Sequence, residues 1–103
     1  MSRVESKLSQ LPDNPGIYLF YGVNNALLYV GKATSLKQRV KSYWQKQRNP
    51  RPIEELIYQV TDIAWVETES VLEAIIMEAN YIKKFNPKYN VLAKMIKVGI
   101  IFI

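Results

Sequence analysis

The sequence predicts a single α/β domain of the α+β type, in which a β-hairpin and one further strand are flanked by helices. Two short apolar runs on either side of a turn predict the hairpin, and segments with apolar residues at helical spacing predict the helices. The chain has 103 residues, and 49% of them are hydrophobic. That length suits one hydrophobic core and is short for two.

A short helix is expected first, over residues 3–10, because Ser2 and Glu5 have the spacing of a capping box. The residues of this helix that should face inward are Val4, Leu8 and Leu11. The stretch 12–16, which contains two prolines, then breaks the chain.

The hairpin is expected from residues 16–21 and 26–31, which flank the turn-type segment 22–25. Because side chains alternate along a strand, every even-numbered loop places Tyr18 and Tyr29 on the same face of the hairpin. The opposite face would carry three aliphatic side chains, Ile17, Leu19 and Leu28.

Two turns satisfy this parity. A turn centred between Val23 and Asn24 places Tyr18 directly opposite Tyr29, whereas a turn made by Asn24 and Asn25 makes Tyr29 the diagonal neighbour of Tyr18. In both cases two phenols lie side by side just before a strongly basic segment. This combination is more typical of a site than of a core.

The next helix can be capped by Thr34 or Ser35, and its apolar residues recur at helical spacing. The residues that should face the sheet are Leu36, Val40, Tyr43 and Trp44. Arg39 lies at the edge of this stripe, beside Tyr43. The more exposed side would carry Lys37, Lys41 and Arg48.

Three further elements are expected in the second half of the chain. Residues 53–60 predict a helix whose inward residues are Ile53, Leu56, Ile57 and Val60. Residues 62–67 are rich in strand formers and predict a third strand. Residues 70–84 predict the clearest helix, which a capping box opens. Its inward stripe would be Val71, Leu72, Ile75, Ile76, Ala79 and Ile82.

Glu78 projects from the margin of that last stripe, between Ile82 and Phe85. A carboxylate beside buried aliphatic groups must be paired, neutralised or bound to a cation, because desolvating a free charge is costly. The alternative, which helical spacing alone favours, is that Glu78 bends outward to water.

Residues 85–90 end this helix in a turn, and residues 91–93 are expected to form a short strand or a docking segment. We expect one domain over residues 1–92, followed by an apolar tail over residues 93–103. This tail either completes a sheet edge as a strand or needs a partner.

The chain contains no cysteine and no histidine. These absences exclude disulfides, thiol nucleophiles, serine-histidine triads and histidine-ligated metal sites. Catalysis would therefore depend on Tyr, Lys, Arg and carboxylates, or on a hard metal held by oxygen ligands. The sequence has neither a run of about 20 apolar residues, which a membrane span needs, nor a signal-peptide pattern, so we expect no membrane association and a cytoplasmic location.

The net charge of +5 is unevenly distributed, because residues 32–51 are basic without an acid and residues 52–81 are acidic without a base. A basic segment with interleaved aromatic residues suits a nucleic-acid backbone, and a merely solvated helix is the alternative. The candidate nucleic-acid-binding residues are Lys32, Lys37, Arg39, Lys41, Lys46, Arg48 and Arg51.

Hydrolysis of a phosphodiester needs an activated water and neutralisation of the developing charge. Tyrosine can act as the base only if a cation lowers its phenol pKa from about 10, and Lys32 is the local candidate beside Tyr29. Arg39 could grip a phosphate oxygen, and Glu78 could hold one Mg²⁺ or Mn²⁺. These residue types alone do not distinguish a nuclease from other proteins that bind nucleic acids.

The order of the motifs resembles the signature of the GIY-YIG endonucleases. The matching residues are Gly16-Ile17-Tyr18, Tyr29-Val30-Gly31-Lys32, Arg39, Glu78 and Asn90. Within that superfamily the chain is most similar to the N-terminal nuclease domain of the UvrC family of excinucleases, through residues 11–16, 30–33, 39–43 and 86–92.

The resemblance implies a small three-stranded antiparallel sheet wrapped by helices, with the activity of a metal-dependent DNA endonuclease of nucleotide excision repair. It implies incision on the 3′ side of a DNA lesion, with DNA and a helicase-like damage-recognition protein as partners. Glu78 would bind the single divalent metal ion, and Asn90 would brace the site.

The resemblance also implies roles for the residues around the two phenols. Tyr29 resembles a general base toward the attacking water, and Tyr18 resembles the residue that helps to place this water. Lys32 would tune this centre, while Arg39 and Tyr43 would contact the scissile phosphate.

Two features depart from the family pattern. The second motif has Val30 where isoleucine is usual, and residues 93–103 are apolar where such chains are usually charged. A stand-alone GIY-YIG nuclease acting on branched or undamaged DNA is therefore one alternative, and a DNA-binding module without turnover is another. The sequence leaves the oligomeric state open.

Overall fold

The computed structural model describes residues 3–45 and 51–91, and the side chains of residues 51–53 are not described. The elements in chain order are α1 (Arg3–Leu8), β1 (Gly16–Tyr21), the 3₁₀ turn η1 (Val23–Asn25), β2 (Leu27–Ala33), α2 (Leu36–Gln45), α3 (Arg51–Gln59), β3 (Asp62–Glu67) and α4 (Val71–Phe85).

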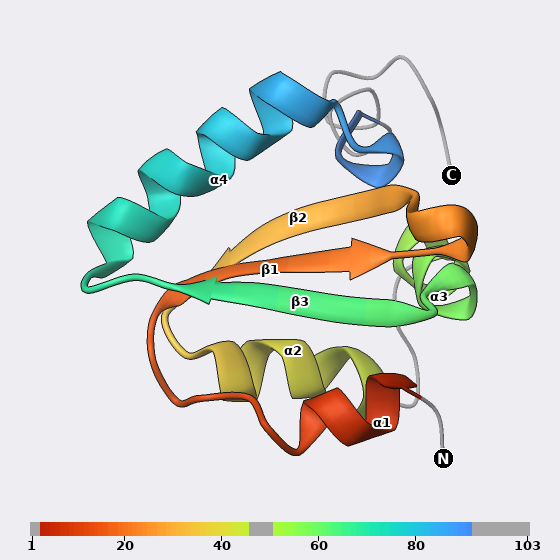
Figure 1. The fold of residues 1–103 in the computed structure, drawn as a ribbon, viewed down its shortest axis with the longest axis horizontal. Helices are drawn as coiled ribbons and strands as arrows, with labels where there is room; N and C mark the ends of the chain where they lie inside the picture. The colour runs from red at the N-terminus through yellow and green to blue at the C-terminus, as the bar shows by residue number, and fades with distance from the viewer. Residues whose placement is uncertain (1–2, 46–50, 92–103) are drawn as a thin grey trace.

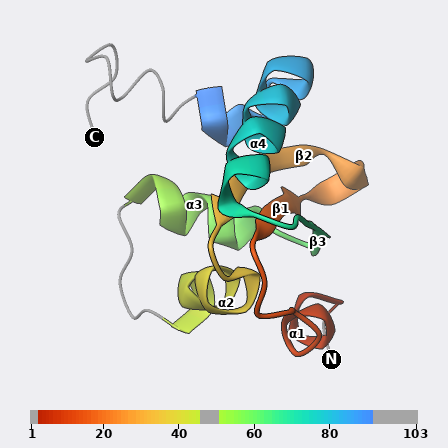
Figure 2. The ribbon, with the colours of Figure 1, turned by 90° about the vertical axis from the view of Figure 1, so that its left-hand side faces the viewer.

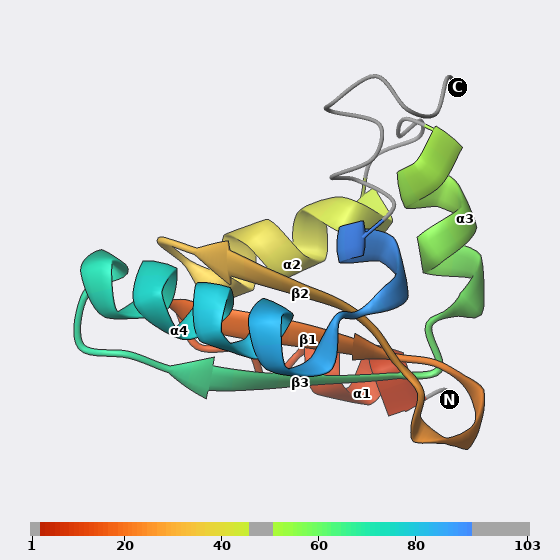
Figure 3. The same ribbon diagram turned by 90° about the horizontal axis from the view of Figure 1, so that it is seen from above.

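The strands form one antiparallel sheet in the order β2-β1-β3, so β1 is central and β2 lies at an edge. Helix α4 covers one face of this sheet, and α1 and α2 lie against the other face (Figures 1 and 2). Figure 3 shows α3 at the end of the sheet where β3 begins. The predicted three-stranded antiparallel sheet flanked by helices is therefore confirmed.

Buried side chains form one cluster on each face of the sheet. The larger cluster faces α1, α2 and α3 and contains Val4, Leu11, Tyr18, Phe20, Leu28, Ala33, Leu36, Val40, Tyr43, Leu56, Ile63 and Tyr89. The smaller cluster lies under α4 and contains Ile17, Leu19, Val30 and Ala74. Two of the tyrosines that the sequence singles out are thus part of the main core.

Most of the expected elements are found where the sequence predicts them. Helix α2 begins directly after Ser35, whose Oγ accepts a hydrogen bond from the Gln38 amide at 3.3 Å, so Ser35 is the cap and Thr34 is not. The predicted third strand coincides with β3. The expected inward residues of α1 and α2 pack on the larger cluster, as do Leu56, Ile57 and Val60 in and after α3.

The two tyrosines are related as the second expected turn predicts, but the loop differs from both expected turns. Tyr21 pairs with Leu27 and the Gly22 amide donates to the Ala26 carbonyl at 2.8 Å, so the loop over residues 23–25 is odd-numbered. Tyr18 lies opposite Gly31 and Phe20 opposite Tyr29, so Tyr29 is the diagonal neighbour of Tyr18 on the same face. In the loop, Asn24 and Asn25 adopt φ values of 60° and 58°. Asparagine tolerates this left-handed backbone better than most residues do, which explains its use here.

The prediction that Leu28 shares a face with Ile17 and Leu19 is wrong. The pairing shifts between Phe20, opposite Tyr29, and Tyr21, opposite Leu27, which leaves Leu28 as an extra residue in β2. This β-bulge breaks the alternation and turns Leu28 into the larger cluster, while Val30 occupies the α4 side.

The predicted inward stripe of α4 is also wrong, except for Ile82. The side chains that pack toward the sheet are Ala74, Met77, Tyr81 and Ile82. The expected core residues Val71, Leu72, Ile75, Ile76 and Ala79 are exposed instead. The helix is apolar on two faces, and the face with the small, fully buried Ala74 is the one that meets β1 and β2.

Glu78 consequently lies within the buried stripe rather than at its margin, because it falls between Met77 and Tyr81 on the inward face of α4. Its side chain is only 18% exposed. The interpretation that Glu78 bends outward to water is therefore wrong, and the paired alternative is found.

Some predictions fall outside the described residues: the Ser2 cap, the basic residues Lys46 and Arg48, and the tail over 93–103. Val91 lies in a helical turn that begins at residue 88, so it is not part of the expected strand. No helix in the described part of the chain is long and apolar enough to cross a membrane.

A substitution at Gly31 tests how tightly the side chains around Tyr18 are packed. A Cβ at this position would overlap the ring and hydroxyl of Tyr18, which is 1% exposed and has no free space to move into. We expect Gly31→Ala to lower the free energy of unfolding by roughly 1–3 kcal/mol through overpacking, measured by urea denaturation. Thr34→Ala, at an exposed position just beyond β2, is the control. A Gly31→Ala chain as stable as the parent would contradict this packing.

Candidate active site

The site begins with three tyrosines that β1, β2 and α2 bring together on one face of the sheet. The ring centroid of Tyr18 lies 6.2 Å from that of Tyr29 and 5.8 Å from that of Tyr43. The hydroxyls of Tyr18 and Tyr43 are 2.7 Å apart and share a hydrogen bond. Tyr43 also hydrogen-bonds Tyr29. The three phenols therefore form a hydrogen-bonded chain with Tyr43 in the middle.

Arg39 lies at the edge of this tyrosine cluster, as the helical spacing predicts. Its Nε donates to the Tyr18 hydroxyl at 3.4 Å, and its guanidinium lies 5.2 Å from the centre of the Tyr43 ring. The guanidinium is held in place by one hydrogen bond and one cation–π contact. Its remaining N–H groups are available to an anion.

The surroundings of Tyr18 and Tyr29 hold the pKa of each phenol above its ordinary value of about 10. Burial, followed by the neighbouring phenols, holds the pKa of Tyr18 far above its ordinary value. Burial, the Tyr43 phenol and the Glu78 carboxylate raise the pKa of Tyr29 to about 12, against the lowering effect of Arg39. The cation that acts on Tyr29 is thus Arg39.

Lys32 and Glu78 form an ion pair on the opposite face of the sheet. Lys32 pairs with Ile17 across the hairpin, so its side chain leaves β2 toward α4, while that of Tyr29 faces α2. The Lys32 Nζ lies 3.4 Å from Glu78 Oε1. Lys32 lies three positions after Tyr29, and an odd spacing in a strand gives opposite faces. The prediction that Lys32 is the local cation for Tyr29 is therefore wrong. Arg39 is the cation that lowers the pKa of Tyr29.

The tyrosine cluster with Arg39 lies on one side of the open edge of β2, and the Lys32–Glu78 ion pair lies on the other side. Asn90 covers this edge at Val30, where its Oδ1 accepts from the Val30 amide and its Nδ2 donates to the Val30 carbonyl, both at 2.9 Å. These are the bonds that a neighbouring strand would otherwise make. Asn90 thus holds the middle of the strand that carries Tyr29 and Lys32.

Glu78 lines a hollow of about 630 Å³ between the second half of α4 and the turn after it. The other residues that line this hollow are Ala79, Ile82, Lys83, Asn86, Asn90 and Val91. Within residues 3–45 and 51–91 there is no group of three or more acidic side chains that could hold a metal. A single carboxylate beside an open hollow fits Mg²⁺, which keeps most of its waters, better than it fits a metal that needs a complete protein shell.

The comparisons with known proteins identify the family. Residues 14–91 match the family model described as the UvrC-like GIY-YIG domain. The chain belongs to this family. It is 44% identical over 91 residues to the UvrABC system protein C of Moorella thermoacetica, and 41% identical over 95 residues to that of Clostridium botulinum strain Hall. These matches cover 88% and 91% of the chain but 15% of each relative, so the chain spans about a seventh of their length.

A solved structure agrees with the fold of this GIY-YIG domain. The N-terminal endonuclease domain of UvrC from Thermotoga maritima, bound to its catalytic magnesium, matches with a TM-score of 0.76 and 30% identity. The match covers 86% of this chain and 97% of that one. The similarity to UvrC predicted from the motifs is thus confirmed.

The basic residues singled out by the sequence are only partly placed around this candidate site. Lys32 and Arg39 lie at it, whereas Lys37 is exposed and Lys41 half-buried elsewhere on α2. Arg51 begins α3. Sequence reasoning gave no functional role to Thr34, Gln38 and Ser42, which line a second hollow together with Lys32 and Arg39. Polar residues on or just before an exposed helix give no sequence signal for such a role.

The raised pKa of Tyr29 predicts a loss of stability at alkaline pH. An unfolded phenol titrates at about 10 and the folded Tyr29 at about 12, so between these values only the unfolded chain releases this proton. The free energy of unfolding should fall as the pH rises from 10 to 12, by about 2–3 kcal/mol from Tyr29 at most.

Urea denaturation at pH 9 and pH 11.5 measures this effect. Tyr29→Phe should reduce the alkaline loss, while Tyr58→Phe should not, because Tyr58 is 92% exposed. An equal alkaline loss in the parent and in Tyr29→Phe would show that Tyr29 titrates normally.

Proposed function

We propose that this GIY-YIG domain hydrolyses a DNA phosphodiester with Tyr29 as the base and one divalent cation held by Glu78. The observation that carries the proposal is the arrangement around the edge of β2, where three linked phenols and Arg39 lie on one face and Glu78 on the other. By its family, the incision would be the one 3′ to a lesion in nucleotide excision repair.

The groups on the α2 face would hold and polarise the DNA backbone. The fixed guanidinium of Arg39 has free N–H donors for a non-bridging oxygen of the scissile phosphate, and the Tyr43 hydroxyl lies beside it. Tyr18, fully buried and bonded to both, keeps this pair in place and helps to position the attacking water.

Glu78 would supply the protein's ligand to Mg²⁺ or Mn²⁺, and the cation would in turn activate water and neutralise phosphate charge. Glu78 is among the groups that raise the pKa of Tyr29. Loss of the negative charge of Glu78 would therefore lower the pKa of that phenol. The Tyr29 phenol would then release its own proton to solvent, and the resulting phenolate would take a proton from the attacking water. Asn90 would brace the strand that carries Tyr29 by its two bonds to Val30.

Within this proposal residues 1–92 form the nuclease domain and residues 93–103 a separate tail. The substrate is DNA, and its damage would be found by a helicase-like partner protein. The relatives are named as parts of a UvrABC system, which is consistent with such a division of labour.

Nicking of DNA tests the assignment of the base and the metal ligand. In Mg²⁺, Tyr29→Phe should slow nicking of a plasmid by at least about a hundredfold, the usual effect of removing a catalytic proton-transfer group. Glu78→Gln should also slow nicking strongly, because it removes the charge of the proposed metal ligand. Chelation with EDTA should abolish nicking by the parent. Glu73→Gln, on the exposed side of α4, and the exposed Tyr58→Phe are matched controls and should stay active.

Full activity in either variant would remove that residue from the mechanism. Lesion-bearing, branched and plain duplexes, each with and without the damage-recognition proteins, would separate a repair enzyme from a stand-alone nuclease. DNA binding with no cleavage under any of these conditions would leave only a binding module.

Lys32 should compete with the metal ion for Glu78. Its ammonium pairs with the carboxylate that is proposed to bind the cation, and both groups are partly screened from water. We expect Lys32→Met to tighten Mn²⁺ binding roughly threefold, the scale of a half-exposed ion pair, as measured by calorimetry. Lys37→Met, which removes the same charge from an exposed position on α2, should change the affinity less. Unchanged or weaker binding in Lys32→Met would exclude this competition.

A further inference from the structure

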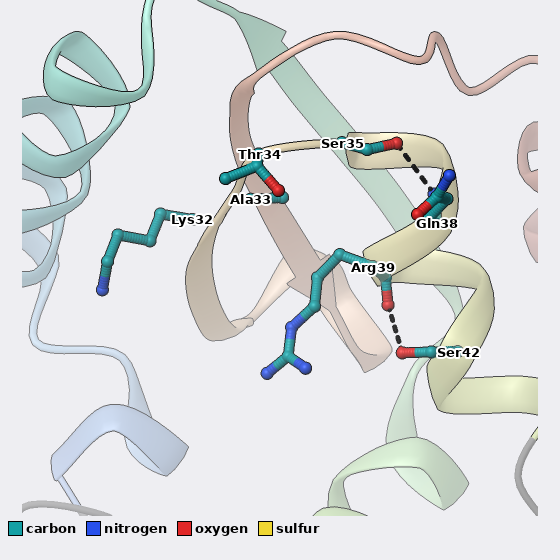
Figure 4. A pocket seen from close by; sticks show the side chains of 7 residues that line it. All are labelled: Lys32, Ala33, Thr34, Ser35, Gln38, Arg39 and Ser42. Atoms are coloured by element: carbon teal, nitrogen blue, oxygen red, sulfur yellow. Dashed lines mark hydrogen bonds between the residues drawn. The ribbon is translucent and has the colours of Figure 1, made fainter.

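A second hollow lies next to the catalytic tyrosines, between the end of β2 and the first turns of α2 (Figure 4). Its volume is about 470 Å³, and it opens to solvent. The residues that line it are Lys32, Ala33, Thr34, Ser35, Gln38, Arg39 and Ser42. The mechanism proposed above uses only two of them, Lys32 and Arg39.

The chemistry of this lining suits an anion that is rich in oxygen. Its lining residues include two cations, of which Lys32 is paired with Glu78 on the α4 side of β2, and no carboxylate. They include neither an aromatic ring nor a large aliphatic side chain against which a base could stack. Such a surface favours a sugar-phosphate group over a nucleobase.

Two of the polar side chains in the hollow are held and two are available. The Ser42 hydroxyl donates to the Arg39 carbonyl at 2.6 Å, and the Ser35 hydroxyl donates to Asp13 while it accepts from the Gln38 amide. By contrast, no hydrogen bond within the described part of the chain involves the side chain of Thr34 or that of Gln38. Both can donate to a ligand.

Arg39 connects this hollow to the tyrosine cluster. Its Nε is directed at the Tyr18 hydroxyl, and the same side chain lines the hollow, where Figure 4 shows it between Lys32 and Ser42. A DNA strand whose scissile phosphate contacts Arg39 would therefore place an adjacent phosphate near the hollow.

We propose that this hollow is a subsite for the sugar-phosphate unit next to the scissile phosphate, with Gln38 and Thr34 as its neutral donors and Lys32 and Arg39 as its cations. This inference rests on the proposed function. The volume exceeds that of a single phosphate group and lies within the range of about 300–1,000 Å³ that is usual for small-molecule pockets. Because nothing in the lining reads a base, the subsite fixes the position of the strand and is indifferent to sequence.

A matched pair of charge substitutions tests the subsite. Gln38→Glu places a carboxylate in the hollow, and Gln45→Glu makes the same chemical change at an exposed position of the same helix. With a fluorescent duplex in EDTA, where no cleavage occurs, Gln38→Glu should weaken binding at least about tenfold and Gln45→Glu less than about threefold, the scale of a lost phosphate contact. The difference should persist for duplexes of unrelated sequence.

A scan with neutral phosphates locates the contact. A single methylphosphonate is placed in turn at each position near the cut. In the parent, cleavage should be slowed most when the methylphosphonate replaces a phosphate that flanks the scissile one. In Gln38→Ala, a methylphosphonate at that flanking position should slow cleavage no more than one at the neighbouring positions. Thermal unfolding of each variant confirms that the fold is intact.

The outcomes separate the two proposals. Equal weakening by Gln38→Glu and Gln45→Glu, or a methylphosphonate profile that Gln38→Ala leaves unchanged, overturns the subsite while metal-dependent cleavage stands. A sequence-dependent effect of Gln38→Glu also overturns it. A parent chain that neither binds nor cuts DNA overturns the proposed function, and the subsite with it.

Discussion

The buried hydroxyl of Tyr18 is the constraint on which the site depends. Tyr18 is 1% exposed, and leaving its O–H without partners would cost about 1–3 kcal/mol. The partners come from α2, since the hydroxyl bonds Tyr43 and accepts from Arg39. Helix α2 can satisfy this hydroxyl only when it docks so that both side chains reach β1. Satisfying one core hydroxyl therefore also fixes the guanidinium beside the phenols.

This docking requires space, which Gly31 provides. Gly31 lies directly opposite Tyr18, and a side chain there would occupy the place of the phenol. The motif glycine of β2 is thus explained by the absence of its Cβ. Helix α4 packs on the other face of the same strand. The small side chain of Ala74 in α4 lets this helix approach closely enough for Glu78 to reach Lys32. Small residues on both sides of the sheet allow the two halves of the site to converge at its edge.

Much of this could be predicted from the sequence, because strand parity and helix spacing are strong local signals. They placed Tyr18 with Tyr29 and Arg39 with Tyr43, as the structure confirms. The displacement of Leu28 could not be predicted, since a β-bulge depends on how the turn closes and not on the apolar pattern.

The orientation of α4 was predicted incorrectly for a related reason. Val71, Leu72, Ile75 and Ile76 make a convincing apolar stripe, yet Leu72 and Ile76 are 65% and 55% exposed. When a helix has two apolar faces, tertiary contacts decide which face is buried. Here the buried face is the one that carries Ala74, whose small side chain fits against the sheet, and Glu78 lies on that face. Helical periodicity alone favoured a position of Glu78 in solvent. The motif match, by contrast, placed Glu78 in the candidate site.

The geometry also suggests how a site without histidine can be switched on. Burial, the Tyr43 phenol and the negative charge of Glu78 raise the pKa of the Tyr29 phenol to about 12. Lys32 offsets that charge only in part, because 48% of its side chain is exposed to solvent. A divalent cation at Glu78 would bring a larger and less mobile charge to the same place. If Tyr29 is the base, as proposed, it would become available only after the cation has bound.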